Sequence, residues 1–266
     1  MPLDDFAAVD AAAAQDGAPD HLVAMMHATD AWPVVRELRE WVLDVTGIGA
    51  DRSGGLVLDV GSGPGTFSRL AATRGARTVD VDPSLVMLGA VRRTRPEARA
   101  VRASVSNLPF RPPPGPGVLV RVERVLQWTD DPGAALRELW RIVPPGGWLA
   151  VTDTDWGSFI VEHDDAAVAA RMTAAAGAWV RHPRVATELP VRVWHLGTVG
   201  ALEHRTDVAV IDRWEPDDPA QRSGPPGLPL RSIAPERPDD VDALAVAARA
   251  GRFRATLDLV TVVGRR

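Results

Sequence analysis

The sequence contains no cysteine and no tyrosine among its 266 residues. Without cysteine the chain forms no disulfide, uses no thiolate nucleophile and offers no cysteine ligand to zinc. Without tyrosine no phenol serves as a general base, and nine tryptophans supply most of the aromatic surface. No apolar run approaches the length that crosses a bilayer, so we expect no membrane partner.

Charge of one sign is not concentrated in any part of the chain. The net charge is -5, and no block of like charges occurs. Because phosphate binding needs a basic face, we expect no nucleic-acid partner. The six histidines are scattered without metal-ligand spacing, which predicts no metal site. The start MPLDDFAAVD lacks the features of a secretory signal, and we expect a cytoplasmic protein.

One stretch organises the rest of the chain. Leu56–Ala72 reads LVLDVGSGPGTFSRLAA: an apolar run, three glycines within five residues, then helix-forming residues. The pattern is typical of a buried parallel strand, a tight turn and a helix. Such a turn brings backbone N–H groups and a helix N-terminus up to a ligand, and glycine permits the close approach.

The glycine spacing separates two kinds of nucleotide-binding turn. Gly61, Gly63 and Gly65 are each two residues apart, whereas the dinucleotide fingerprint is G-x-G-x-x-G. Asp59 lies at the strand end, where its charge would repel a pyrophosphate but suits an ammonium or sulfonium group. The segment resembles motif I of the class I S-adenosylmethionine (SAM) methyltransferases. A nicotinamide-dependent oxidoreductase stays open as an alternative.

Three later segments resemble the same family in the same order. They are DPSLVML at 82–88, VRASVSNLPF at 101–110 and ERVLQWTDDP at 123–132. The PPGG at 144–147 then precedes an apolar strand, a pattern typical of the family. The resemblance covers about 100 residues well, as judged from these motifs.

The expected fold is α/β: a Rossmann-like, doubly wound sheet of about seven strands whose last strand is antiparallel. We expect an N-terminal helical lid at residues 1–50, of which 1–19 are loosely ordered, and a SAM-binding domain at 51–266. A helix should begin at Thr29 or Asp30 and end at Gly47. Strand five should end at Asp153, followed by a helical cap at about 157–195 or by an ordinary surface helix pair.

Asp82 ends the second predicted strand, where a carboxylate is placed to accept hydrogen bonds from both ribose hydroxyls of a nucleoside. Met87 either packs against adenine or is core. The family usually has aspartate where Ser104 stands, and Val105 offers its backbone N–H to the adenine ring. The resemblance implies SAM as the cofactor and these binding residues: Asp59, Gly61, Ser62, Gly63, Asp82, Pro83, Met87, Ser104, Val105 and Glu123.

The acceptor should lie over the ends of strands four and five. The predicted substrate residues are Gln127, Trp128, Asp155, Trp156 and His182. Related sugar O-methyltransferases use a histidine after strand four and an acid after strand five. Here Gln127 and Trp128 replace the histidine, while Asp153 is kept. Asp153 and His163 are therefore the candidate catalytic residues, although a solvated surface histidine is the commoner interpretation for both His163 and His182.

These observations predict SAM-dependent methyl transfer to the oxygen, nitrogen or carbon of a small molecule, in secondary metabolism. Trp128, Trp156 and Trp179 suggest a flat or aromatic acceptor. Two alternatives keep SAM binding: an enzyme repurposed for a reaction other than methylation, and a non-catalytic binding protein. The acceptor and the oligomeric state, a homodimer included, are left open by the sequence.

Overall fold

The structure is a computed structural model that describes residues 19–50, 54–200 and 202–266. All but the last residue of the segment predicted to be loosely ordered, 1–19, lies outside them. In the described part, strands pair into one sheet in the order β3-β2-β1-β4-β5-β7-β6. The strands are β1 (Leu56–Val60), β2 (Arg77–Asp82), β3 (Arg99–Arg102), β4 (Val118–Glu123), β5 (Trp148–Val161), β6 (Glu203–Ile211) and β7 (Ala255–Arg265).

Strands β1 to β5 pair in parallel, and β7 runs antiparallel between β5 and β6. The predicted Rossmann-like sheet with an antiparallel last strand is thus confirmed. β1 lies between β2 and β4, and helices cover both of its faces: Val57 packs toward one layer of helices and Leu58 and Val60 toward the other. An apolar run rather than an alternating pattern follows from this position.

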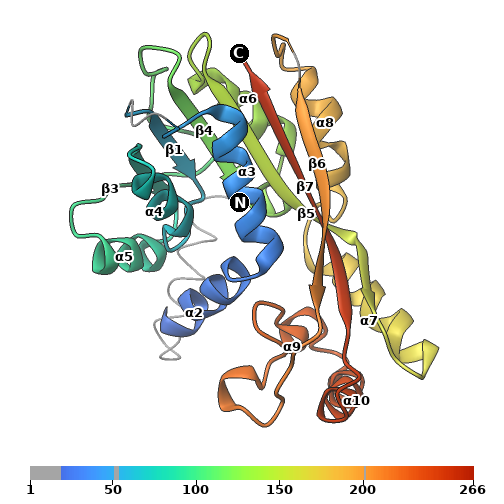
Figure 1. The fold of residues 1–266 in the computed structure, drawn as a ribbon. Coiled ribbons are helices and arrows are strands. Elements are labelled where there is room, and N and C mark those ends of the chain that lie inside the picture. Colours follow the sequence, from blue (N-terminus) through green and yellow to red (C-terminus); the bar gives the residue numbers. More distant parts are fainter. Residues whose placement is uncertain (1–18, 51–53, 201) are drawn as a thin grey trace.

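Helices cover both faces of the sheet (Figure 1). On one face lie α3 (Pro33–Thr46) and α4 (Thr66–Thr73), and on the other lie α6 (Pro132–Ile142) and α8 (Val185–Trp194). α5 (Leu85–Thr94) packs against β2 and β3, and α2 (Pro19–Asp30) packs against α5. No helix in the described ranges is long and apolar enough to cross a membrane.

Strands β5, β7 and β6 extend well beyond the rest of the sheet and carry a second group of helices (Figure 1). The group contains α7 (Ala166–Trp179), α9 (Leu230–Ile233) and α10 (Pro238–Arg249), around a core that includes Phe159 and Phe253. A short 3-10 turn, η2 (Pro219–Gln221), precedes α9. The part of the sheet formed by β1 to β4 and the extended part formed by β7 and β6 therefore meet along β5.

Two predicted boundaries are wrong. Strand five does not end at Asp153, because after an irregularity between Asp155 and Ile160 it pairs again with β7 as far as Val161. The segment at 157–195 therefore starts as strand and continues as α7 and α8, of which α8 covers the sheet. The predicted helix start at Thr29 or Asp30 is also wrong, because both residues belong to α2 and α3 begins at Pro33. The predicted end of this helix is right, since Gly47, with φ +65°, caps α3 after Thr46.

Candidate active site

The glycine turn lies between β1 and α4, at the carboxyl edge of the sheet, where ligands of open parallel sheets bind. The N–H groups of Gly61 and Ser62 donate to the carbonyl of Val81, at 2.7 and 3.0 Å. Gly61, Gly63 and Gly65 all have positive φ, +70°, +54° and +77°. Because other residues rarely adopt this conformation, the backbone here depends on glycine.

The three glycines differ in what a side chain at each would meet. A Cβ on Gly61 would lie 2.2 Å from Val125 Cγ2, and one on Gly65 would lie 2.9 Å from Val91 Cγ2. A Cβ on Gly63 would meet no described atom within 4 Å. Gly61 and Gly65 are therefore packed against protein, whereas Gly63 faces open space, where a ligand can approach the backbone.

Asp82 ends β2 beside this open space. Its Oδ2 accepts a hydrogen bond from the N–H of Gly63, and its Oδ1 accepts one from the N–H of Ser84, both at 2.9 Å. Ser84 in turn caps α5, because its hydroxyl accepts from the N–H of Met87. The structure thus joins the glycine turn, the acid of β2 and the start of α5, and the binding of a nucleoside there stays a prediction.

The remaining predicted adenine residues lie near β2 and β3. Met87 packs with Val23 of α2, so α2 lies over the start of α5. The carbonyl of Pro83 accepts from Arg102 Nε at 2.9 Å. Ser104 Oγ lies 2.8 Å from Ser106 Oγ, and Val105 is buried in the sheet core. Contact of these residues with adenine stays a prediction.

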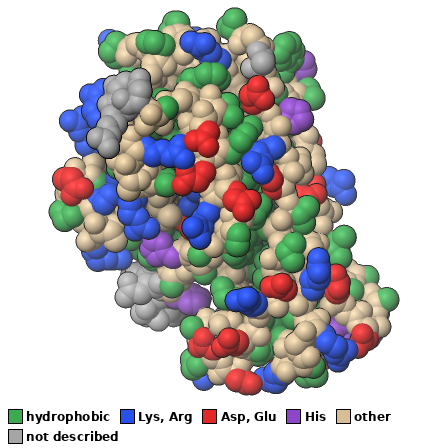
Figure 2. All heavy atoms as spheres, in the orientation of Figure 1, with side chains coloured by type: hydrophobic (Ala, Val, Ile, Leu, Met, Phe, Trp, Pro, Cys, Tyr) green, Lys and Arg blue, Asp and Glu red, His purple; other side chains and the backbone are tan. Residues whose placement is uncertain are grey.

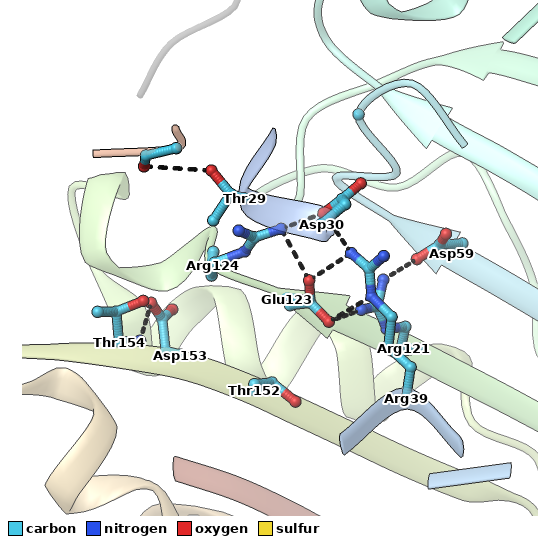
Figure 3. A network of polar contacts seen from close by, with 12 residues as sticks. Thr29, Asp30, Arg39, Asp59, Arg121, Glu123, Arg124, Thr152, Asp153 and Thr154 are labelled. Atoms are coloured by element: carbon cyan, nitrogen blue, oxygen red, sulfur yellow. Dashed lines mark hydrogen bonds and ion pairs between the residues drawn. The ribbon is translucent and has the colours of Figure 1, made fainter. Parts of the chain in front are cut away.

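A buried charge network lies beside the turn (Figure 3). We use this name for six side chains: Asp30, Arg39, Asp59, Arg121, Glu123 and Arg124. The network holds equal numbers of carboxylates and guanidiniums, so its formal charge is zero. Its members come from α2, α3, β1 and the end of β4.

One half of the network ties the N-terminal helices to β4. Arg39 Nη2 lies 2.6 Å from both Asp30 Oδ1 and Glu123 Oε1, and Arg124 Nη2 lies 2.5 Å from the same Asp30 oxygen. Burial alone would raise the pKa values of Asp30 and Glu123, but the adjacent guanidiniums lower both. Arg124 has φ +58°, the only positive φ outside glycine among the described residues. Strain of this kind often accompanies a functional site.

The other half of the network reaches the strand that precedes the turn. Arg121 Nη1 lies 2.8 Å from Asp59 Oδ1, and Nη2 of the same guanidinium pairs with Glu123. Ser68 donates to the second oxygen of Asp59 at 3.2 Å, and the guanidinium lies over the ring of Phe67. Asp59 and Glu123, the two predicted residues of the network, are both buried, and each forms an ion pair with Arg121.

Sequence reasoning missed Asp30, Arg39, Arg121 and Arg124. The signal was present at two of them, because Arg121 interrupts the apolar run of β4 and Arg39 lies on the apolar face of α3. A charge at such a position is seldom buried without a partner.

The predicted residues that follow β4 and those at 153–156, within β5, are largely brought together. A 3-10 turn, η1 (Leu126–Trp128), follows β4, and Gln127 Oε1 accepts from Trp156 Nε1 at 2.8 Å. Trp179 of α7 packs edge-to-face on both Trp128 and Trp156, with ring centroids 5.1 and 4.8 Å apart. Asp153 holds η1 in place, since its Oδ2 accepts from the N–H groups at 126 and 127.

The two predicted histidines lie in different places. His182 lies near the site: its backbone N–H donates to the carbonyl of Gln127, and its ring Nε2 lies 2.9 Å from the carbonyl of Thr129. His163 lies beyond the far end of β5, in a surface cavity of about 330 Å³ that Arg252 also lines. Eight further residues of β5 separate Asp153 from the strand end, so the structure does not bring Asp153 and His163 together.

Asp155 lies on the face of β5 that bears α8. Its carboxylate accepts from the N–H of Gly157 at 2.9 Å, and it is paired in register with Asp258 of β7. Burial raises the pKa of Asp155, and the charge of Asp258 adds to the rise. Trp156 points to the opposite face, so Asp155 and Trp156 do not line one surface.

Stability should depend on pH through Asp153. Burial raises the pKa of this carboxyl to about 7, against the effect of backbone N–H groups at Thr154, Gln127 and Leu126. The unfolded chain has a value of about 3.9, so the folded state retains a proton that the unfolded state loses. The stabilisation is complete below pH 4 and lost as pH rises through 7. Between pH 5 and 8 we expect a loss of about 2–3 kcal/mol in the free energy of unfolding.

Urea unfolding of wild type and Asp153→Asn at both pH values measures this dependence. As pH rises, wild type should lose more of its free energy of unfolding than Asp153→Asn does, because asparagine does not titrate. Asp242→Asn, at a carboxylate whose side chain is 61% exposed, serves as the control and should follow wild type. A gap between wild type and Asp153→Asn that is the same at both pH values would contradict the assignment.

Comparison with known proteins finds similarity in the central segment of the chain. The methyltransferase domain family matches residues 58–151. A malonyl-[acyl-carrier protein] O-methyltransferase from Pseudescherichia vulneris is 36% identical over 102 residues, which are 38% of this chain and 40% of that protein. A demethylmenaquinone methyltransferase from Renibacterium salmoninarum is 32% identical over 155 residues, 55% of this chain and 64% of that protein. The chain thus covers less than two thirds of either relative.

A solved structure shares the fold. Haemonchus contortus phosphoethanolamine N-methyltransferase 2, determined with S-adenosyl-L-methionine, aligns with a TM-score of 0.59 at 15% identity, over 100% of this chain and 60% of that one. The strand order, the glycine turn and the family match agree with one another. The predicted resemblance is confirmed at this level: residues 58–151 match the methyltransferase domain family, and the chain shares its fold with a solved SAM-dependent methyltransferase.

Proposed function

We propose that the protein transfers a methyl group from SAM to a small-molecule acceptor of secondary metabolism, in the cytoplasm. The observation that carries this proposal is the open space at Gly63 beside the carboxylate of Asp82, inside the matched segment. A nucleoside fits there because the backbone can approach it and a carboxylate can accept from ribose hydroxyls. SAM supplies a methyl group on a positively charged sulfur.

Each part of the cofactor has an assigned partner in this proposal. Backbone groups of Gly61, Ser62 and Gly63 face the methionine part, and Asp82 with Pro83 faces the ribose. Met87, Ser104 and Val105 surround adenine. Asp59 and Glu123 act indirectly, because they fix Arg121 and the end of β4 rather than present free oxygens.

We place the acceptor over η1, against Gln127, Trp128 and Trp156, with His182 behind them. The packed indoles of Trp128, Trp156 and Trp179 offer the acceptor an apolar surface, which favours a reaction whose charge disperses in the transition state. Asp153 is fully buried and accepts only backbone N–H groups in the contacts described. It therefore positions η1 and does not touch the acceptor, so transfer relies on alignment of the reacting atoms.

Product analysis tests the reaction. Incubated with SAM and candidate acceptors, the protein should yield a product heavier by about 14 Da, with S-adenosylhomocysteine formed in equal amount. SAM binding with a transformed acceptor that gains no methyl group would show a repurposed enzyme and contradict the proposal. Tighter binding of NADH than of SAM in a calorimetric titration would also contradict it.

Asp82→Asn should weaken SAM binding at least tenfold, which corresponds to about 1.4 kcal/mol. The first reason is that the ribose hydroxyls lose a charged hydrogen-bond acceptor. The second is that the two oxygens of Asp82 accept hydrogen bonds from two backbone N–H groups, and the NH2 of asparagine would face one of these donors. Isothermal titration calorimetry measures the dissociation constant. The exposed carboxylate variant Asp242→Asn should bind as wild type, and equal affinity in both variants would show that Asp82 has been misassigned.

A further inference from the structure

Strand β6 forms an edge of the sheet and leaves apolar side chains uncovered. Within the described ranges it pairs with β7 alone. α8 packs against β5 and β7, and beside it Val208 and Val210 of β6 are 53% and 47% exposed. A nine-residue edge strand with unpaired backbone groups and an apolar surface is a template for pairing with another chain.

The charges of β6 are arranged symmetrically about one residue. Arg205 precedes Thr206 and Asp207 follows it, and both charged side chains lie on the α3 face, where Arg205 Nε is 2.6 Å from Asp207 Oδ2. When two copies of β6 meet antiparallel about Thr206, Arg205 of each copy lies opposite Asp207 of the other. A two-fold axis through Arg205 would instead oppose two arginines, and one through Asp207 two aspartates. Charge therefore favours the register centred on Thr206.

The neighbouring groove has the same mixed character. A groove of about 570 Å³ runs between α3 and β6, lined by Pro33, Arg36, Glu37, Glu40, Trp41, Asp44 and Arg205. Figure 2 shows acidic and basic side chains side by side on the face that these elements form. A surface that carries both signs can complement an identical surface turned by a two-fold axis.

We propose that the protein is a homodimer in which two β6 strands pair antiparallel about Thr206 and join the two sheets into one. The interface is isologous: the same backbone edge and the same pairs of Arg205 with Asp207 occur twice. Val208 of each copy lies opposite His204 of the other on the outer face. The occupant of the edge is thus a second copy of this chain, and the proposal does not depend on the reaction.

Sedimentation velocity of the full chain measures its mass in solution. We expect twice the 28.5 kDa of one chain at micromolar concentration. A monomer up to 100 μM would overturn the proposal.

The absence of cysteine allows a direct test of the register. In Thr206→Cys the two introduced side chains would face each other, with Cβ atoms about 5 Å apart, so mild oxidation should link the subunits. In His204→Cys the two thiols would be about 14 Å apart along the strands and should stay unlinked. Linking through residue 204 and not through 206 would overturn the proposed pairing.

A charge swap supplies the last control. Asp207→Arg sets like charges opposite each other and should weaken dimerisation at least tenfold. The double variant Arg205→Asp with Asp207→Arg restores opposite charges both within each strand and between strands, so it should dimerise as wild type. Glu203→Gln lies opposite Ala209 in this register and should have no effect. Failure of the swap to restore the dimer lost in Asp207→Arg would contradict the interface.

Discussion

Gly63→Ala is expected to weaken SAM binding at least 100-fold while the protein still folds. The new Cβ would meet no described protein atom within 4 Å, so the fold has room for it. The φ of +54° makes alanine unfavourable by about 1–2 kcal/mol, which a domain of this size tolerates. The Cβ would occupy the space that we assign to the cofactor. Calorimetric titration with SAM measures the loss, and circular dichroism confirms folding.

Two other glycines separate strain from contact with the ligand. Gly251 has φ +68°, and a Cβ there would also meet no described atom within 4 Å. Gly251→Ala therefore carries similar backbone strain far from the site and should bind SAM as wild type does. Gly61→Ala would place a Cβ 2.2 Å from Val125 and should destabilise the fold itself. Equal SAM affinity in Gly63→Ala and Gly251→Ala would mean that the cofactor lies elsewhere.

Arg121→Met should reduce the free energy of unfolding by about 3–5 kcal/mol. The guanidinium pairs with Asp59 and Glu123, which are fully buried and 7% exposed, respectively. Its removal leaves two carboxylates in a low-dielectric interior with less compensation, and this costs far more than the loss of an exposed pair. Urea unfolding followed by circular dichroism measures the change.

Arg192→Met is the matched control, because Arg192 pairs with Glu188 on the surface and the two side chains are 40% and 52% exposed. The exposed pair should contribute less than about 1 kcal/mol. Arg121→Met and Arg192→Met remove the same charge and add the same side chain. If the two variants lost equal stability, the buried charge network would not have the structural role described.

The elements around the glycine turn were predictable because the residues that specify them are close together in the sequence. β1, the glycine turn and α4 follow from an apolar run, three glycines and a helical stretch within Leu56–Ala72. The end of β5 was not predictable from Asp153 onward. Its continuation depends on pairing with Ala255 and Thr256, about a hundred residues later, past an irregularity that breaks the alternating pattern.

The buried charge network escaped prediction for the same reason. Arg39 contacts Glu123 across 84 positions, and Arg121 contacts Asp59 across 62. A single sequence shows that a charge interrupts an apolar face but not which partner meets it. Thr29 and Asp30 read as helix caps from local propensity, yet Asp30 is a partner for Arg39 and Arg124, so tertiary pairing prevailed over the capping preference.

The most direct test is a crystal structure of the protein with S-adenosylhomocysteine. The account predicts density for the ligand against the backbone of Gly63, with both ribose hydroxyls within hydrogen-bond distance of the Asp82 carboxylate. Ligand density at another surface of the protein, or a ribose that does not contact Asp82, would contradict the assignment of the cofactor site.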